Sequence, residues 1–337
     1  MNIYIPSVDA AASMIYSAYV NENFDRLREI QEYLESRDVA RRIAGSASEF
    51  HNASVSLTRI GFFDYAFSLL EVAQERYPRD TDILADLLLY GMKCRNLSEL
   101  REYQKKLENI DKPLWTWRAF HFQFDYLLEE LRYAETDTAA KELAAKIEVL
   151  IKDYKENSEH FADLSDKEKA YMVEYEYYSF KRDKKKAIDA LKAATIALPN
   201  KCAQCALKLA DHYFEVGDNK NAIKYSELAV NIKEDQPSIS LGYAYYILAM
   251  SREHDVRNIG GALAEAKVKP IFSAYAAAVE YMREESGREG LLKSVKNQVK
   301  TLEYDSGVPS KINFSNVGSG ASDLRRLLES KLMQESE

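Results

Sequence analysis

The stretch from Glu168 to Gln236 reads EKAYMVEYEYYSFKRDKKKAIDALKAATIALPNK (168–201) and then, after Cys202, AQCALKLADHYFEVGDNKNAIKYSELAVNIKEDQ (203–236). The second half repeats the first at an offset of 35 residues. Aromatic, acidic and alanine positions recur in both halves: Tyr178 and Tyr213, Asp183 and Asp218, Ala187 and Ala222. A period near 34 residues is typical of stacked helix pairs, so this stretch predicts two successive helical hairpins.

Composition extends the same interpretation to the rest of the chain. The 337 residues include only 12 glycines and seven prolines, and no long β-branched alternation interrupts the helical periodicity. Helix is therefore the expected structure throughout. A chain of this length exceeds what one compact core usually holds, which favours an elongated or divided molecule.

A further segment with the same repeat pattern lies at Ala47–Pro78. Large residues, small residues, a turn glycine and a final proline recur at fixed spacing: Phe50, Ala53, Leu57, Gly61, Ala66, Leu70, Ala73 and Pro78. Small side chains let two helices approach closely, and proline ends the second helix. This pattern and the 168–236 pair resemble the tetratricopeptide repeat (TPR) family. The resemblance implies an all-α fold, a right-handed α-solenoid of antiparallel helix pairs.

The domain prediction has three parts. Residues 1–163 form the N-terminal half of the solenoid, with weak TPR units that are best at 47–80. Residues 164–303 hold the C-terminal TPR-like units, and 304–337 form a loop and a capping helix. The helices expected outside the clear repeats are Val8–Val20, Phe24–Ser36, Asp82–Lys93, Ser98–Asn109, Ala139–Tyr154, Pro237–Arg252, Asn258–Lys267, Pro270–Glu285, Arg288–Leu302 and Leu324–Met333.

An aromatic helix is expected at 114–133, opened by Pro113. Its six aromatic residues cannot share one narrow stripe: Trp115, Trp117, Phe120, Phe122, Phe124 and Tyr126. Such a helix is either buried on two sides or offers an interface. Burial is favoured, and both interpretations stay open.

The net charge and the cysteine content limit which partners and which cellular compartment are expected. A net charge of −8 and a pI near 5.4 argue against general nucleic-acid binding, which needs a basic surface. Three cysteines make no extracellular disulfide framework, so a cytoplasmic location is expected. Neither a signal peptide nor an apolar stretch of membrane-spanning length is recognised, so no membrane partner is expected.

The sequence gives only weak signals of catalytic or metal-binding motifs. Cys202 and Cys205 form a CxxC that could be a redox pair or half of a zinc site with His212, but structural zinc needs four ligands. Two small packing cysteines are the favoured interpretation. The histidines are scattered, and no nucleophile elbow follows a strand. We therefore expect no catalytic residues, no metal, no cofactor and no enzyme activity.

The TPR resemblance implies that the first helices of successive units line a groove that holds a polypeptide. Carried over by position, the partner-binding residues are Lys169, Met172, Glu176, Phe180, Leu207, Lys208, Asp211 and Glu215. Glu176 and Asp211 occupy the same motif position, so a basic segment is favoured. The basic clamp of chaperone-binding TPRs is absent at these positions.

The leading hypothesis is a non-enzymatic, cytoplasmic scaffold or adaptor that binds a protein or peptide. The first alternative is a regulator that senses a peptide, although residues 1–46 carry no helix-turn-helix signature. The second is an enzyme with a cryptic site at the aromatic helix. The sequence leaves the partner, the pathway and the oligomeric state open.

Overall fold

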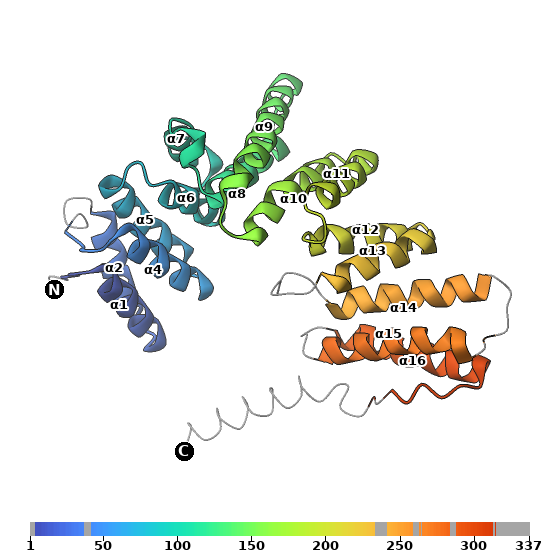
Figure 1. Cartoon of the computed structure of the whole chain (residues 1–337). Helices are drawn as coiled ribbons and strands as arrows, with labels where there is room; N and C mark the ends of the chain where they lie inside the picture. The colour runs from blue at the N-terminus through green and yellow to red at the C-terminus, as the bar shows by residue number, and fades with distance from the viewer. Residues whose placement is uncertain are drawn as a thin grey trace, which may run out of the picture. The chain divides into compact units, whose positions relative to one another are not determined.

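The computed structural model describes residues 4–36, 42–232, 241–258, 263, 265–283, 288–312 and 314 (Figure 1). Over these residues it contains fifteen α-helices, two short 3-10 helices and no strand beyond a single bridge between Ser7 and Ala44. The predicted all-α class is confirmed. None of the helices described is both long and apolar enough to cross a membrane.

The chain divides into two compact units, Met1–Tyr177 and Tyr178–Glu337, which we call the N-terminal and C-terminal units. The division falls inside helix α10. The first unit contains α1 (Val8–Val20), α2 (Phe24–Glu35), α4 (Ala47–Arg59), α5 (Phe63–Arg76), α6 (Thr81–Cys94), α7 (Leu97–Glu108), η1 (Lys112–Leu114), α8 (Trp117–Arg132), α9 (Asp137–Asn157), η2 (Ser158–His160) and most of α10 (Leu164–Phe180).

The C-terminal unit contains α11 (Lys184–Ala197), α12 (Ala203–Glu215), α13 (Asn219–Asn231), α14 (Leu241–Asn258), α15 (Glu265–Arg283) and α16 (Glu289–Ser306). In both units, helices pack mainly on neighbours in the chain, as α4 does on α5 and α12 on α13 (Figure 1). These adjacent pairs are TPR-like helical repeats. The right-handed sense of the superhelix and the three-part domain division stay predictions.

Four helix pairs share one turn. A residue with positive φ follows each first helix: Glu22 (52°), Gly61 (87°), Arg182 (57°) and Gly217 (76°). The next amide then donates to a carbonyl five residues back, as Asp183 does to Tyr178 and Asp218 to Tyr213, both at 2.9 Å. The turn therefore joins α1 to α2, α4 to α5, α10 to α11 and α12 to α13.

The aligned aspartates explain where two second helices begin. The side chain of Asp183 accepts from the amide of Lys186 at 3.1 Å, and that of Asp218 accepts from the amide of Asn221 at 3.1 Å. A side-chain oxygen at this position satisfies an amide that has no partner within the helix. The offset of 35 residues thus preserves both the cap and the turn.

The predicted packing positions of Ala47–Pro78 are confirmed. The following side chains are buried between α4, α5 and their neighbours: Phe50, Ala53, Leu57, Ala66, Leu70 and Ala73. The aromatic helix is also buried at most positions: Phe120, Phe122, Phe124 and Tyr126 on α8, with Trp115 just before it. Trp117 is the aromatic residue of this group that stays partly exposed.

Two details of the N-terminal predictions are wrong. Phe24, expected on the apolar stripe of α2, is 67% exposed, while Leu27 and Ile30 are buried. Helix α7 begins after Asn96 and not after Ser98. The Asn96 amide donates to the Glu99 carboxylate at 3.4 Å, which forms the reciprocal cap that Ser98 could not make.

The C-terminal predictions also need correction. Helix α14 runs through Asn258, so no short second helix begins there, and α15 begins at Glu265 with Pro270 inside it. On α16 the buried stripe begins at Leu292 and not at Leu291. The predicted capping helix Leu324–Met333 lies outside the described residues.

Candidate functional site

A row of ionisable side chains crosses the first helices α4, α6 and α8. His51, Asp86 and His121 stand 35 residues apart, one on each helix. His51 Nδ1 lies 2.5 Å from Asp86 Oδ2, and Arg118 forms an ion pair with the other oxygen of the same carboxylate. The Asp86 side chain is fully buried (0% exposed). Because an unpaired buried carboxylate is costly, these two partners are what allow it there.

The start of α8 is fixed to α6 by the same network. Thr116 caps α8 by accepting from the Ala119 amide at 3.3 Å, and its hydroxyl donates to Asp82 at 2.6 Å. Arg118 Nε lies 3.9 Å from Asp82. We call His51, Asp82, Asp86 and Arg118 the charged ladder. Its cross-helix bonds hold the side chains of three first helices in fixed positions.

Trp117 and Lys169 extend this surface. The Lys169 ammonium lies 3.3 Å from the centroid of the Trp117 ring and pairs with Asp166 at 2.8 Å. A cation over an indole face is favourable, more so where water is partly excluded. The pairing positions a part-exposed aromatic ring beside the ladder residue Arg118, whose guanidinium carbon lies 5.7 Å from the ring centroid.

His121 and Asp125 carry shifted proton affinities on successive turns of α8. Burial, followed by the nearby Lys169 charge, lowers the pKa of His121 to about 4. Burial raises the pKa of Asp125 to about 6, and Lys93 opposes that rise. His121 Nε2 and Asp125 Oδ2 are 4.0 Å apart. The imidazole is therefore neutral at pH 7, while Asp125 titrates just below neutrality.

The predicted partner-binding residues of the N-terminal unit have unlike environments. Lys169 is engaged with Trp117 and Asp166. Met172 is only 3% exposed, so it packs in the interior and presents little surface to a partner. Glu176 is half-buried on the same helix.

In the C-terminal unit, Asp211 accepts a hydrogen bond of 2.5 Å from the Tyr243 hydroxyl of α14. Burial and Asp211 together raise the pKa of that phenol. Glu215 is exposed, whereas Leu207 packs against a buried cluster. Phe180 and Lys208 are half-buried. Tyr243 was not among the predicted site residues, although it stands 35 residues after Lys208.

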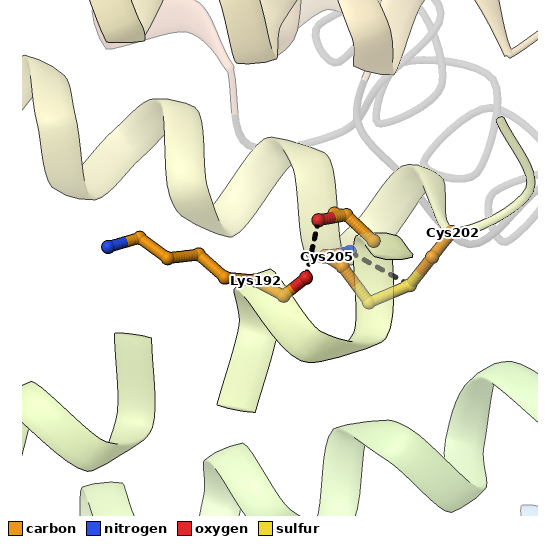
Figure 2. Close-up of a disulfide and its surroundings, with 4 residues drawn as sticks. Lys192, Cys202 and Cys205 are labelled. Carbon is orange, nitrogen blue, oxygen red and sulfur yellow. Dashed lines mark hydrogen bonds between the residues drawn. A yellow bond between two sulfur atoms is a disulfide. The ribbon is translucent and has the colours of Figure 1, made fainter. Parts of the chain in front are cut away.

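The CxxC pair is joined by a disulfide at the start of α12. Figure 2 shows this bond with Lys192 of α11, whose carbonyl accepts from Thr195 at 2.8 Å. The Cys202 sulfur also accepts from the Cys205 amide at 3.3 Å and so caps the helix. The expected burial of both cysteines is confirmed, but the favoured interpretation as two separate packing cysteines did not include the bond between them, which only the redox-pair alternative allowed. While the bond is intact, neither sulfur is the thiolate that zinc binds.

No family model and no curated protein matches the chain. Solved structures do match. A thermophilic TPR protein of Thermus thermophilus, TTC0263, is 19% identical, with 60% of this chain and 100% of that chain covered and a TM-score of 0.43. A circular tandem repeat protein is 15% identical over 88% and 70% of the two chains, with a TM-score of 0.24.

A monomeric mutant of IFIT1 with Gppp-AAAA is 12% identical over 99% of this chain and 85% of that chain, with a TM-score of 0.24. All three TM-scores are too low to support an inference. The TPR-like assignment therefore rests on the helix pairs of this chain and on their shared turn.

Proposed function

We propose that the protein is a non-enzymatic scaffold that holds a polypeptide against its first helices. The observation that carries the proposal is the charged ladder, in which residues of α4, α6 and α8 are fixed by bonds between helices. Fixed polar groups beside a part-exposed Trp117 suit recognition, because ordering them adds no further entropic cost on binding. The buried aromatic helix leaves little of itself for a cryptic active site.

The partner segment that we propose is basic. On α12, Asp211 and Glu215 are one turn apart, and Tyr243 holds the Asp211 carboxylate in place. Glu176 adds an acid on α10. Opposite charges steer association and favour one partner over others. The other proposed contact residues are Lys169 of the N-terminal unit and Phe180 and Lys208 of the C-terminal unit. Met172 and Leu207 support them by packing within their own units.

The test begins with capture of a partner by the full-length chain and continues with purified components. We expect the double variant Glu176→Lys and Asp211→Lys to weaken binding by about tenfold or more and to reduce its salt dependence. The matched control reverses two exposed acids on second helices, Glu142→Lys and Asp189→Lys, and should bind normally. Unchanged affinity and salt dependence in the folded test variant would refute the basic-segment proposal.

A Trp117→Ala variant tests the scaffold surface independently of charge. Loss of an aromatic hot spot typically costs at least about 2 kcal/mol of binding free energy. If both Trp117→Ala and the double variant bind as the wild type does, the first helices are not the binding surface. Circular dichroism of each variant establishes that the helices are intact.

A further inference from the structure

A pocket of about 430 Å³ opens in the N-terminal unit, where the end of α7, the 3-10 helix η1, α8 and α9 meet. Leu127 of α8 and Val149 and Leu150 of α9 form its apolar wall. The volume falls within the roughly 300–1,000 Å³ of small-molecule sites. The residue of the lining with unusual surroundings is Lys112, at the start of η1.

The short helix η1 places the side chain of Lys112 on an aromatic ring. The Trp115 amide donates to the Lys112 carbonyl at 3.0 Å, which closes the 3-10 turn. In a 3-10 helix, side chains three residues apart lie one above the other. The Lys112 ammonium therefore rests 3.1 Å from the centroid of the Trp115 ring. The ring is itself fixed, because its indole N–H donates to the Ile110 carbonyl at 3.0 Å.

Lys112 differs from the other lysine of this unit that lies on an indole. Lys169 rests on the Trp117 ring and also pairs with Asp166 at 2.8 Å. Among the described residues, the Lys112 ammonium has neither an ion pair nor a hydrogen bond beside its contact with the ring. Its Nζ is not closed off from solvent, although it has no such partner. The amine is thus held in place on one side and accessible on another.

The charged groups nearest to Lys112 also line the pocket. Burial lowers the pKa of Lys112 to about 8, and Asp153 of α9 and Glu108 of α7 oppose that shift. The α8 residues of the lining are uncharged, and Lys146 of α9 is exposed. The ring favours the ammonium by about 0.5–2 kcal/mol, which offsets only part of the effect of burial. A larger share of Lys112 than of an ordinary lysine is therefore the nucleophilic free amine near neutral pH.

We propose that Lys112 covalently binds an aldehyde on a neutral, apolar body, as a reversible imine formed in this pocket. The Nζ lone pair attacks the carbonyl carbon, and the oxygen takes up a proton to give a carbinolamine. The hydroxyl then leaves with a proton as water while nitrogen loses its remaining proton. One amine and one aldehyde thus give one imine and one water, without any oxidant or reductant.

The lining favours an uncharged aldehyde. When Lys112 is the free amine, the two acids Glu108 and Asp153 face Lys146 alone, so a carboxylate on the ligand would meet an excess of negative charge. The apolar body instead gains by lying against Leu127 and Leu150. The proposal does not depend on the polypeptide-binding function.

The experiment measures where an aldehyde reacts on the full-length chain. The chain is incubated at pH 7 with 4-isopropylbenzaldehyde and cyanoborohydride, which reduces each imine to a stable secondary amine. Peptide mass spectrometry then gives the label at Lys112, at Lys146 in the same pocket and at the exposed Lys141. We expect about tenfold or more label at Lys112, because one unit of pKa alone changes the free-amine fraction tenfold.

Two further measurements identify the site of reaction. With 4-formylbenzoate, the ratio of label at Lys112 to label at Lys141 should fall. In Lys112→Arg, which keeps a positive charge over the ring, the excess label should disappear while that at Lys146 stays. Label at Lys112 no greater than at Lys146 in the wild type would overturn the proposal.

A blocking variant separates the pocket from the amine. Ala145→Trp, at the exposed edge of the pocket on α9, should reduce the reaction of Lys112 with 4-isopropylbenzaldehyde but not with formaldehyde, which is far smaller. Glu142→Trp lies about one turn earlier on α9, outside the pocket lining, and should change neither reaction. If Ala145→Trp reacts with both aldehydes as the wild type does, the pocket does not hold the aldehyde and the proposal is wrong.

Discussion

Arg182 shows how the repeat's geometry constrains a single residue. Its φ of 57° lies in the left-handed region, where the equivalent residues Gly61 and Gly217 meet no steric penalty. An L side chain in that region costs roughly 1–2 kcal/mol. The turn nevertheless forms at Arg182, because the helices on either side and the Asp183 cap determine its path.

Reciprocal substitutions at the two aligned turns test this cost. Arg182→Gly should raise the free energy of unfolding by about 0.5–1 kcal/mol, since relief of strain exceeds the added freedom of the unfolded chain. Gly217→Arg should lower it by about 1 kcal/mol. A Cβ at Gly217 meets no atom within 4 Å, so no steric clash at that atom adds to the backbone strain. Urea denaturation measures both, and a Gly217→Arg protein as stable as the wild type would contradict the argument.

The charged ladder also shows where sequence reasoning reaches its limit at the residue scale. A search for repeats finds positions where residue types recur, as Asp183 and Asp218 do. His51 and Asp86 are likewise 35 residues apart, but they are complementary and not alike. Their pairing follows from the packing of α4 on α6. The sequence therefore shows the spacing of 35 residues but does not show that the two side chains form a pair.

At the scale of the helix, α8 places two groups with opposite pH behaviour one turn apart. The folded-state pKa of His121 is about 4, below its ordinary value of 6.5, because burial disfavours the charged imidazole. The contribution of His121 to the free energy of unfolding is therefore present at higher pH and is lost as the pH falls through about 6.5 toward 4. The pKa of Asp125 is about 6, above its ordinary value, so its contribution is present at low pH and is lost as the pH rises from about 4 through 6. Between about pH 4 and 6 the two effects oppose each other.

Single variants should separate them. In Asp125→Asn, the free energy of unfolding relative to the wild type should increase from about pH 4 to pH 6, because only His121 still titrates there. In His121→Gln it should decrease over the same interval. Each change should be about 1–2 kcal/mol, less than the full linkage value because both side chains are part-exposed. Denaturation at three pH values measures this, and parallel profiles for both variants would contradict the assigned pKa shifts.

Helix boundaries were predictable where local signals agreed with packing. Ser7 predicted the start of α1, and its side chain does accept from the Ala10 amide at 3.3 Å. Pro270 predicted a helix start and instead lies inside α15, at a cost of roughly 3 kcal/mol for an interior proline. Val268, one turn into that helix and fully buried, requires the helix to begin earlier. Burial of side chains on both sides of Pro270, such as Val268 and Ile271, offsets the cost of the interior proline. Rules based on the local sequence cannot predict this compensation, because it depends on tertiary packing.

At the scale of the molecule, the chain is two compact units of adjacent helices, and four of the helix pairs share one turn. In repeat proteins, each hairpin is stabilised chiefly by its own core and by the hairpins next to it. The periodicity of the sequence was sufficient to predict the pairs α4–α5 and α12–α13, but not the pair that α14 forms with α15. The division within α10 was not predictable in the same way, because the periodicity runs through that helix without interruption.

Stability should therefore be lost locally when a core residue is truncated. Leu209 of α12 is fully buried in the C-terminal unit, so Leu209→Ala should destabilise that unit by roughly 2–5 kcal/mol. Amide hydrogen exchange should show reduced protection in α12 and α13, with little change in α4 to α8. Ile196→Ala, at a largely exposed position of α11, is the control and should leave all protection unchanged. Equal loss of protection in both units would mean that the chain unfolds as one cooperative body. The two units would then not be independent in their stability.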